Sequence, residues 1–248
     1  MAEKIPELSI ILPAYKEKEN LAIFIPQIEA EFQGTPFEII VVDDNSKDGT
    51  RELIAELDKK YHNVVLIERP GLMGIGSALR DGYNKARGEY ILSSDADLSF
   101  ITKDMSALYD KIRTGFDMVL GYRIRSAPTN EEKHEKKLSK HALKAWMEDS
   151  ITSPLSNWTI RMMSGVRLRN YNTNFRIIRS SMWRKFLTVE DRQFFLFEAI
   201  FRAKQSGARI TEIPVTFSTR KFGESKVSFL KQAPKYFLKL VRYTVFGK

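Results

Sequence analysis

The chain has 248 residues, no cysteine, 43% hydrophobic residues and a net charge of +9. This composition fits a globular chain with a sizeable core, and the lack of cysteine excludes a disulfide framework and thiolate chemistry. Three scattered histidines give little support to a histidine metal site or a Ser-His-Asp triad. No apolar run approaches the ~20 residues that span a bilayer, and the amino terminus lacks the apolar core of a signal peptide. We therefore expect a chain that is not transmembrane and that works in a reducing compartment.

The positive charge belongs to the second half of the chain. Residues 1–120 hold 14 basic and 21 acidic residues, a net charge of −7, whereas residues 121–248 hold 26 basic and 10 acidic residues, a net charge of +16. A basic half indicates an anionic partner, such as a phosphate, a nucleic acid or the anionic face of a membrane. A basic solvated surface explains such a one-sided excess less well.

Apolar runs and amphipathic stretches alternate along the chain, which predicts strands and helices in turn. We predict strands at residues 8–12, 37–42, 64–68, 90–92, 118–121, 174–178 and 209–215. We predict helices at about residues 19–32, 50–61, 103–114 and 190–206, and one that opens at 71–78 and runs to about 87. This alternation predicts an α/β fold with a Rossmann-like, mostly parallel sheet flanked by helices.

Two carboxylates one residue apart, Asp95 and Asp97, follow the predicted strand at 90–92. In open α/β sheets, ligands bind at the carboxyl ends of the strands. Side chains at i and i+2 of an extended segment point the same way, so both carboxylates can converge on one hard cation. Mg²⁺ or Mn²⁺ is commonly held in this way beside a diphosphate. Alone, an Asp-x-Asp pair is more often a solvated turn or cap.

Four motifs occur in order along the chain. They are Pro13-Ala14-Tyr15-Lys16-Glu17, Val41-Val42-Asp43-Asp44-Asn45-Ser46 followed by Asp48-Gly49-Thr50, Gly74-Ile75-Gly76-Ser77-Ala78, and Asp95-Ala96-Asp97-Leu98. Together they resemble the inverting family-two glycosyltransferases, above all the dolichol-phosphate mannosyltransferase group and its polyprenyl-phosphate relatives. The resemblance spans about residues 8–226 and continues through Phe175-Arg176, Glu198 and Gly223-Glu224-Ser225-Lys226.

The resemblance implies an A-type glycosyltransferase fold and a specific reaction. A sugar would pass from a nucleotide-sugar donor, with GDP-mannose favoured, to a polyprenyl or dolichyl phosphate, with inversion and with Mg²⁺ or Mn²⁺ as cofactor. The residues that it implies for nucleotide binding are Pro13, Tyr15, Glu17, Asp44, Gly76, Ser77 and Asp95. The ion would be held by Asp95 and Asp97. Asp43, next to Asp44, fits either an Asx-turn residue or a helix cap.

A lipid phosphate is already an anion, so the protein must offset the repulsion between two anionic substrates rather than supply a strong base. The residues that the resemblance implies for the acceptor phosphate are Arg123, Arg176, Arg220 and Lys226. The residues that it implies for catalysis are Asp97, Arg123, Arg176 and Glu198. Glu198 also fits an ordinary i,i+4 pair with Arg202.

Two alternatives stay open at this point. In the first, the enzyme uses UDP-glucose or UDP-GlcNAc and a saccharide hydroxyl, with Glu198 as the only obvious base. In the second, the chain is a non-enzymatic module that binds nucleic acid or an anionic surface. We do not expect nucleic acid as a partner, because no reader motif is present and the acidic half carries the ordered carboxylates.

Some positions depart from the family pattern. Ser99 stands where relatives often place a third metal ligand, Asn170 replaces the usual Asp, and Asn174 replaces a Gly. Asn174 can still keep the turn, because Asn tolerates a positive φ better than most residues. Asn170 lacks a charge, which leaves the details of the sugar and the acceptor open.

We divide the chain into a catalytic domain at 1–226, in which 126–168 is a basic and aromatic elaboration near the acceptor site, and a basic amphipathic segment at 227–248. Residues 220–248 carry eight basic groups and one acidic group. Such a segment suits a helix on an anionic membrane, and it suits a core helix equally well. We expect a cytoplasmic protein, peripheral at the cytosolic face of a membrane, with the need for a membrane-spanning partner subunit left open.

Overall fold

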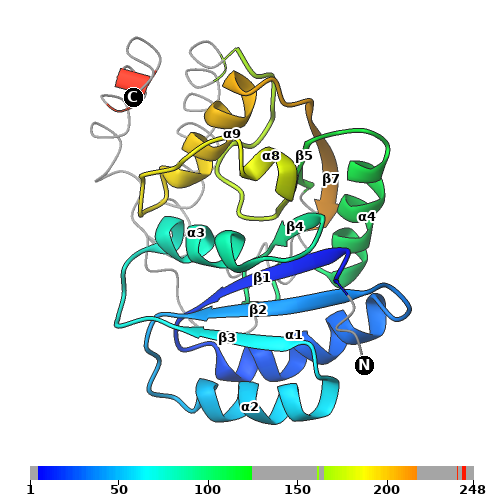
Figure 1. Cartoon of the computed structure of the whole chain (residues 1–248), viewed down its shortest axis with the longest axis vertical. Coiled ribbons are helices and arrows are strands. Elements are labelled where there is room, and N and C mark those ends of the chain that lie inside the picture. Colours follow the sequence, from blue (N-terminus) through cyan, green and yellow to red (C-terminus); the bar gives the residue numbers. More distant parts are fainter. Residues whose placement is uncertain (1–4, 125–160, 162–164, 217–238, 240–241, 244–248) are drawn as a thin grey trace, which may run out of the picture.

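The computed structural model of the chain describes residues 5–124, 161, 165–216, 239, 242 and 243 (Figure 1). The strands are β1 (Leu8–Ala14), β2 (Phe37–Asp43), β3 (Val64–Glu68), β4 (Tyr90–Ser93), β5 (Met118–Ile124), β6 (Arg176–Arg179) and β7 (Ile210–Thr216). The helices are α1 (Lys18–Glu31), α2 (Thr50–Tyr61), α3 (Ile75–Lys85), α4 (Thr102–Arg113), α8 (Ser180–Trp183) and α9 (Phe195–Gln205). Most of the predicted elaboration at 126–168 and of the segment at 227–248 lies outside the described residues, as do Arg220 and Lys226.

The seven strands form one sheet in the order β3-β2-β1-β4-β6-β5-β7. Every neighbouring pair is parallel except the two pairs that involve β6, which runs antiparallel to β4 and to β5. The prediction of a mostly parallel, helix-flanked α/β sheet is therefore confirmed. The antiparallel β6 matters for the site, because it brings the residues before Arg176 to the carboxyl end of β4.

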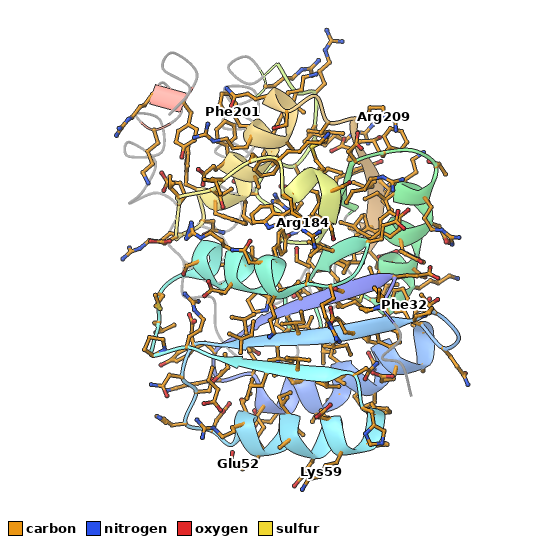
Figure 2. All side chains as sticks on the ribbon, in the orientation of Figure 1. Phe32, Glu52, Lys59, Arg184, Phe201 and Arg209 are labelled. Atoms are coloured by element: carbon orange, nitrogen blue, oxygen red, sulfur yellow. The ribbon has the colours of Figure 1, made fainter. Side chains whose placement is uncertain are left out.

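Helices cover both faces of the sheet, and the strands alternate their side chains between two apolar cores (Figure 1). In β1, Ile10 and Leu12 pack with α1, α2 and α4, whereas Ile11 packs with α3 and α9. This period-two alternation of apolar residues buried on both faces is the pattern of a central parallel strand. Charged residues of α2, such as Glu52 and Lys59, point away from the sheet (Figure 2).

The helix predicted to begin at Glu190 begins instead at Phe195, so this boundary was wrong. The backbone N–H groups of Val189 and Glu190 donate to the carboxylate of Glu198 at 2.9–3.0 Å. The Glu198 side chain accepts hydrogen bonds from backbone N–H groups that lie before the first helical turn. The residues before α9 therefore form an irregular segment. The strand predicted at 174–178 likewise begins later, at Arg176, because Phe175 N–H donates to Thr173 Oγ1 in a preceding turn.

The chain order of the strands reverses beside β1. From β1 the chain moves outward to β2 and β3, then returns to place β4 on the other side of β1. The carboxyl ends of β1 and β4 therefore flank a topological switch point, the place where open α/β sheets bind ligands. Within the described ranges, no helix combines the length and the apolar character needed to cross a membrane.

Candidate nucleotide and metal site

The turn after β4 carries the predicted metal pair. Asp97 is 4% exposed, and its Oδ1 accepts the backbone N–H of Ser99 at 3.1 Å. Leu98 has a φ of +59°, an uncommon backbone conformation for a branched residue, so the turn is strained at this position. Asp95 is partly exposed, and its Oδ1 accepts Nδ2 of Asn174 at 3.2 Å. The two carboxylates thus leave β4 in a turn that neighbouring residues fix in place.

Two buried oxygen atoms beside these carboxylates lack a hydrogen-bond partner. They are Oγ of Ser99 and Oδ1 of Asn174, both in side chains that are at most 4% exposed. Buried polar atoms are normally satisfied, so unpaired ones beside two carboxylates fit a ligand or water that completes the site. Among the residues that the structure describes, no cluster of three or more Asp, Glu, His or Cys could hold a metal alone. A site with two carboxylates suits Mg²⁺ or Mn²⁺, because phosphate oxygens and water usually complete their shells.

Backbone strain gathers in the loops after the central strands. Besides Leu98, Lys16 after β1 and Asn45 after β2 have φ values of +60° and +62°. The two loops touch, since the backbone N–H of Lys16 donates to Oγ of Ser46 at 2.8 Å. Strained residues persist where the surrounding structure holds them, and they concentrate at functional sites. The three loops therefore mark one edge of the sheet as the candidate site.

The residues predicted to line the nucleoside lie on the first of these loops. Pro13 belongs to β1, and Tyr15 and Glu17 follow it with partly exposed side chains. Glu17 Oε2 accepts Nδ2 of Asn20 at 2.6 Å, at the start of α1. The structure therefore places these residues at the switch point, and their role in binding a nucleoside stays a prediction.

The two neighbouring aspartates at the end of β2 have different partners. Asp43 accepts the backbone N–H and the hydroxyl of Ser46, three positions on, at 2.8 and 2.5 Å, so its carboxylate stabilises the turn after β2 without forming the i to i+2 bond of an Asx turn. Asp44 is buried, and its Oδ1 accepts Nη1 of Arg69 at 2.6 Å. Burial raises the pKa of Asp44, although the Arg69 guanidinium and the backbone N–H of Met73 act in the opposite direction. Asp44 is thus an anchored carboxylate, and its predicted contact with the base stays a prediction.

Arg69 connects three elements at this edge. Besides Asp44, its guanidinium contacts Oγ of Ser77, the carbonyl of Gly74 at 3.4 Å and Oδ2 of Asp81 at 3.2 Å. Its side chain is almost completely buried. It therefore ties the ends of β2 and β3 to the first turns of α3. Arg69 was not among the residues predicted from sequence, although its position directly after β3 is a signal for a residue at this edge of the sheet.

The amino terminus of α3 is closed by protein. The backbone N–H of Ser77 donates to the carbonyl of Asp191 at 3.0 Å. A Cβ atom at Gly76 would lie 2.5 Å from Cβ of Phe195 and 2.6 Å from the carbonyl of Glu190. The close approach of the segment before α9 is therefore enough to require glycine there. Phosphate binding by Gly76 and Ser77 stays a prediction. The presence of glycine at position 76 does not support it, because packing alone requires glycine there.

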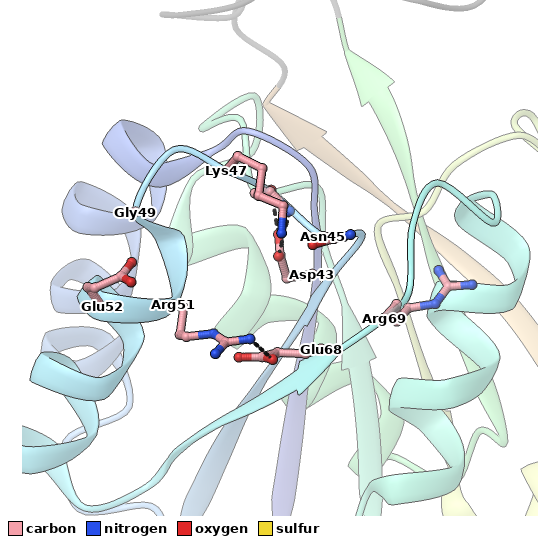
Figure 3. A pocket seen from close by; sticks show the side chains of 9 residues that line it. Asp43, Asn45, Lys47, Gly49, Arg51, Glu52, Glu68 and Arg69 are labelled. Carbon is pink, nitrogen blue, oxygen red and sulfur yellow. Dashed lines mark hydrogen bonds and ion pairs between the residues drawn. The ribbon is translucent and has the colours of Figure 1, made fainter.

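A pocket of about 510 Å³ opens beside these loops, between the β2–α2 turn and the end of β3 (Figure 3). Its polar lining comes from Asp43, Asn45, Ser46, Lys47, Gly49, Arg51, Glu52, Glu68 and Arg69. Arg51 and Glu68 form an ion pair across it, and both side chains remain substantially exposed. Exposed ion pairs contribute little to stability, so this pair can open to admit a polar ligand.

The two described arginines that were predicted to bind the acceptor phosphate differ in exposure. Arg123 is exposed, with its guanidinium 6.0 Å from the Phe100 ring. Arg176 is completely buried, and it donates to the carbonyls of Thr173 and Leu196 at 3.0 and 2.8 Å. Burial lowers the pKa of Arg176 to about 10. Arg123 is therefore accessible to a ligand, whereas Arg176 stabilises the turn before β6 through its hydrogen bonds to backbone carbonyls.

Comparison with known proteins identifies the family to which this site belongs. Residues 9–190, most of the chain, match the model of the family described as "Glycosyl transferase family 2". The chain belongs to glycosyl transferase family 2. The match includes the four ordered motifs, so the family membership predicted from those motifs is confirmed.

Curated relatives within this family act on polyprenyl phosphates, by their names. The chain is 28% identical over 237 residues to the undecaprenyl-phosphate 4-deoxy-4-formamido-L-arabinose transferase of Yersinia enterocolitica, covering 93% of this chain and 65% of the relative. It is 31% identical over 232 residues to the dolichol-phosphate mannosyltransferase of Pyrococcus furiosus, covering 89% of this chain and 59% of the relative. The chain thus spans less than two thirds of the length of these relatives.

Solved structures show the same fold at low identity. The glucosyl-3-phosphoglycerate synthase of Mycobacterium tuberculosis, in complex with Mn²⁺, UDP and glucosyl-3-phosphoglycerate, matches with a TM-score of 0.66 and 12% identity over 95% of this chain and 77% of that chain. A complex of the same protein with Mg²⁺ and UDP matches with a TM-score of 0.66 and 14% identity over 95% of this chain and 79% of that chain. At this identity the likeness shows the fold, which is the A-type glycosyltransferase fold that the motifs predict.

Glu198, predicted from sequence to act in catalysis, lies beyond the residues that the family model matches, and its role stays a prediction. It is completely buried, and its carboxylate accepts the N–H groups of Val189 and Glu190 and the hydroxyl of Tyr243. Lys239 also reaches this segment through an ion pair with Glu190. Glu198 therefore joins the segment before α9 to residues near the end of the sequence, a structural role that its sequence context did not reveal.

Proposed function

We propose that this glycosyl transferase family 2 chain transfers a sugar from a nucleotide-sugar donor to a polyprenyl phosphate, with inversion. The observation that carries the proposal is the switch point between β1 and β4, where Tyr15, Asp95 and Asp97 leave adjacent parallel strands. An apolar ring and a pair of carboxylates at one crevice suit a nucleoside and the ion that accompanies its diphosphate.

The donor end of the site has defined roles for individual residues. Tyr15 offers a ring and Glu17 an acceptor to the nucleoside, while Asp95 and Asp97 would hold Mg²⁺ or Mn²⁺. When bound, the ion supplies charge neutralisation to the departing nucleoside diphosphate. Asn174, in the turn before β6, donates a hydrogen bond to the Asp95 carboxylate and so fixes its direction. The Mn²⁺ and Mg²⁺ complexes of the structurally similar synthase support such an ion.

The proposed polyprenyl phosphate acceptor is supported by the names of the relatives and by the positive charge of the residues assigned to bind it. Both curated relatives described above carry a polyprenyl phosphate in their names. A lipid phosphate attacks as an anion, so cations beside it are needed more than a base. Arg123 is the exposed guanidinium that we assign to it, and Arg220 and Lys226 are proposed for the same role from their sequence motifs.

The saccharide-hydroxyl alternative is less well supported, because it needs a base. Its only nominee, Glu198, is completely buried and already accepts hydrogen bonds from two backbone N–H groups and one hydroxyl. A base must reach the proton that it removes. We therefore do not assign Glu198 to proton transfer.

The proposed acceptor places the enzyme at a membrane. We propose peripheral binding at the cytosolic face, with residues 1–226 as the catalytic domain and the basic residues 227–248 toward the lipid. GDP-mannose is the donor that we favour, since a dolichol-phosphate mannosyltransferase is 31% identical to this chain. A membrane-spanning partner subunit is compatible with this arrangement.

Donor binding and transfer test the proposal in turn. Thermal unfolding is measured with GDP-mannose, UDP-glucose and UDP-GlcNAc, each with and without Mn²⁺, because a ligand that binds only the folded state raises the midpoint. The donor that raises the midpoint in a Mn²⁺-dependent way is then incubated with a short-chain polyprenyl phosphate. We expect a glycosyl-phosphoryl-polyprenol of inverted configuration. Donor binding without transfer to the lipid phosphate, but with transfer to a saccharide, would overturn the proposed acceptor.

A further inference from the structure

Large apolar side chains protrude at one place on the surface. Of the seven exposed large apolar residues among those that the structure describes, four lie on two loops. Leu72 and Met73 in the β3–α3 loop are 65% and 49% exposed, and Leu187 and Val189 before α9 are 86% and 67% exposed. We call these four residues the apolar rim. Single exposed apolar residues are ordinary, but a group on neighbouring loops indicates an interaction site.

The two loops of the apolar rim are packed against each other. A Cβ atom at Gly74 would lie 2.4 Å from the carbonyl of Asp191 and 3.3 Å from Cγ of Arg192. Arg80 of α3 donates to the carbonyl of Thr188 at 2.8 Å and forms an ion pair with Asp191. The rim is therefore presented by a fixed pair of loops. Thr188 is buried between the outward-facing Leu187 and Val189.

The apolar rim lies at the edge of the sheet that carries the candidate site. The β3–α3 loop leaves the carboxyl end of β3, beside the end of β2 that bears Asp44 and at the same edge of the sheet as the Asp95 turn after β4. Figure 1 shows both loops at the side of the molecule to which β2 and β3 point. A partner that binds the rim therefore lies on the same side as the substrates.

The charge around the apolar rim is suited to an anionic partner. Each acidic residue of the loop before α9 is paired with a cation, Glu190 with Lys239 and Asp191 with Arg80. Arg192 adds an exposed guanidinium beside Gly74. With both acids paired, Arg192 gives the loop a positive charge beside its exposed apolar side chains, a combination typical of proteins that enter the boundary between headgroups and acyl chains. Each basic group near such a surface adds attraction to anionic lipids.

We propose that the apolar rim inserts into the surface of an anionic membrane, with Arg192 at the headgroups. This inference rests on the proposed function, because a polyprenyl phosphate acceptor is itself held in the bilayer. Insertion of the rim brings the carboxyl edge of the sheet to the depth of the lipid phosphate. The donor site and the acceptor then meet without the lipid leaving the membrane.

Vesicle binding without donor or acceptor tests the surface alone. The full chain is sedimented with vesicles of phosphatidylcholine and with vesicles that contain phosphatidylglycerol, at low and high salt. We expect the double variant Leu187→Glu/Val189→Glu to partition into the anionic vesicles at least about tenfold more weakly, since two exposed apolar groups no longer insert. The matched control is Ile5→Glu/Ile23→Glu, which changes two exposed isoleucines outside the two rim loops and should bind like the unchanged chain. Arg192→Gln should reduce the preference for anionic over neutral vesicles.

Three outcomes would overturn the apolar rim as a membrane surface. One is equal vesicle binding by the rim variant and the unchanged chain. Another is a lowered thermal midpoint of the rim variant, which would mean that the chain itself covers the rim. A third is a dimer of the unchanged chain that the rim variant converts to a monomer. The proposed reaction is assayed separately in detergent with a short-chain acceptor, so failure of transfer and failure of the surface are distinguishable.

Discussion

The hydroxyl of Tyr243 donates to Oε1 of Glu198 at 2.8 Å, so two side chains 45 positions apart in the sequence share a buried hydrogen bond. The same carboxylate holds the backbone of Val189 and Glu190, and the carbonyl of Asp191 in turn receives the N–H of Ser77 on α3. Burial raises the pKa of Tyr243, and its bond to Glu198 acts in the same direction. A residue near the end of the sequence is thereby connected to the helix beside the candidate site.

The main effect of a substitution at Glu198 should therefore be on the free energy of unfolding rather than on sugar transfer. We expect Glu198→Ala to lower the free energy of unfolding by about 2–4 kcal/mol, because buried donors are left without an acceptor. Tyr243→Phe removes one bond to a charged group and should cost about 2 kcal/mol. Urea unfolding measures both changes. If Glu198→Gln keeps the stability of the unchanged chain and yet abolishes sugar transfer, Glu198 acts in catalysis and the structural assignment is wrong.

Removal of Arg69 should destabilise the fold in a pH-dependent way. Arg69→Met leaves Asp44 buried without its cation, which should cost about 3–5 kcal/mol at pH 8. The pKa of Asp44 is already raised by burial, and loss of the guanidinium raises it further. A raised carboxyl pKa means that ionised Asp44 disfavours the folded state above that pKa. This penalty disappears as the pH falls and Asp44 is protonated, so the variant should be less destabilised at pH 5 than at pH 8.

The control for this prediction removes the carboxylate as well. In Arg69→Met/Asp44→Asn no buried charge remains at this position, so the difference between pH 5 and pH 8 should be small. Urea unfolding at the two pH values, each compared with the unchanged chain, gives the result. Equal destabilisation of Arg69→Met at both values would show that Asp44 is not the group that titrates.

The metal pair gives a prediction about ion-dependent binding. Asp97→Asn keeps an oxygen that can accept the N–H of Ser99, so the turn should stay folded. It removes a negative charge, and we expect the Mn²⁺-dependent rise in thermal midpoint with the donor to be lost and transfer to fall at least ~100-fold. Asp110→Asn, an exposed carboxylate on α4, is the matched control. Transfer by Asp97→Asn at the control's rate would remove Asp97 from the ion site.

Much of the fold follows from local sequence pattern, and the exceptions have a common cause. The helix at 50–61 was predicted at its observed bounds, because its amphipathic spacing and its turn residues are contiguous. The helix expected from Glu190 begins at Phe195, because the side chain of Glu198 accepts the hydrogen bond of the preceding Val189 N–H group. The direction of β6 depends on pairing with strands far away in the sequence, which a single strand's pattern does not encode.

The candidate site divides in the same way. Asp95 and Asp97 stand together in a short motif after a buried strand, so their place in the turn after β4 could be predicted, whereas their convergence on one ion stays a prediction. Arg69 could not be connected to Asp44 from sequence, since 25 positions separate them. Arg176 was assigned to the acceptor phosphate from its motif, and the structure adds that its side chain is buried and donates to backbone carbonyls. Burial is a tertiary property that residue type does not reveal.

Asn174 yields the most specific prediction for the ion. It donates to Asp95 at 3.2 Å, and its own oxygen is buried without a partner. Asn174→Gly introduces the residue common in the family and removes both groups from the site. We expect the Mn²⁺ concentration required for the donor-induced thermal shift to rise about tenfold or more, because residues that orient metal ligands typically contribute that much affinity.

A second substitution separates the two roles of Asn174. Asn174→Asp keeps an oxygen in place of the buried amide oxygen but cannot donate a hydrogen bond when ionised. If the oxygen contacts the ion, Asn174→Asp should bind Mn²⁺ more tightly than Asn174→Gly. If Asn174 only orients Asp95, both variants should be weakened alike, since the donor is lost in each. An unchanged Mn²⁺ requirement in both variants would place Asn174 outside the ion site altogether.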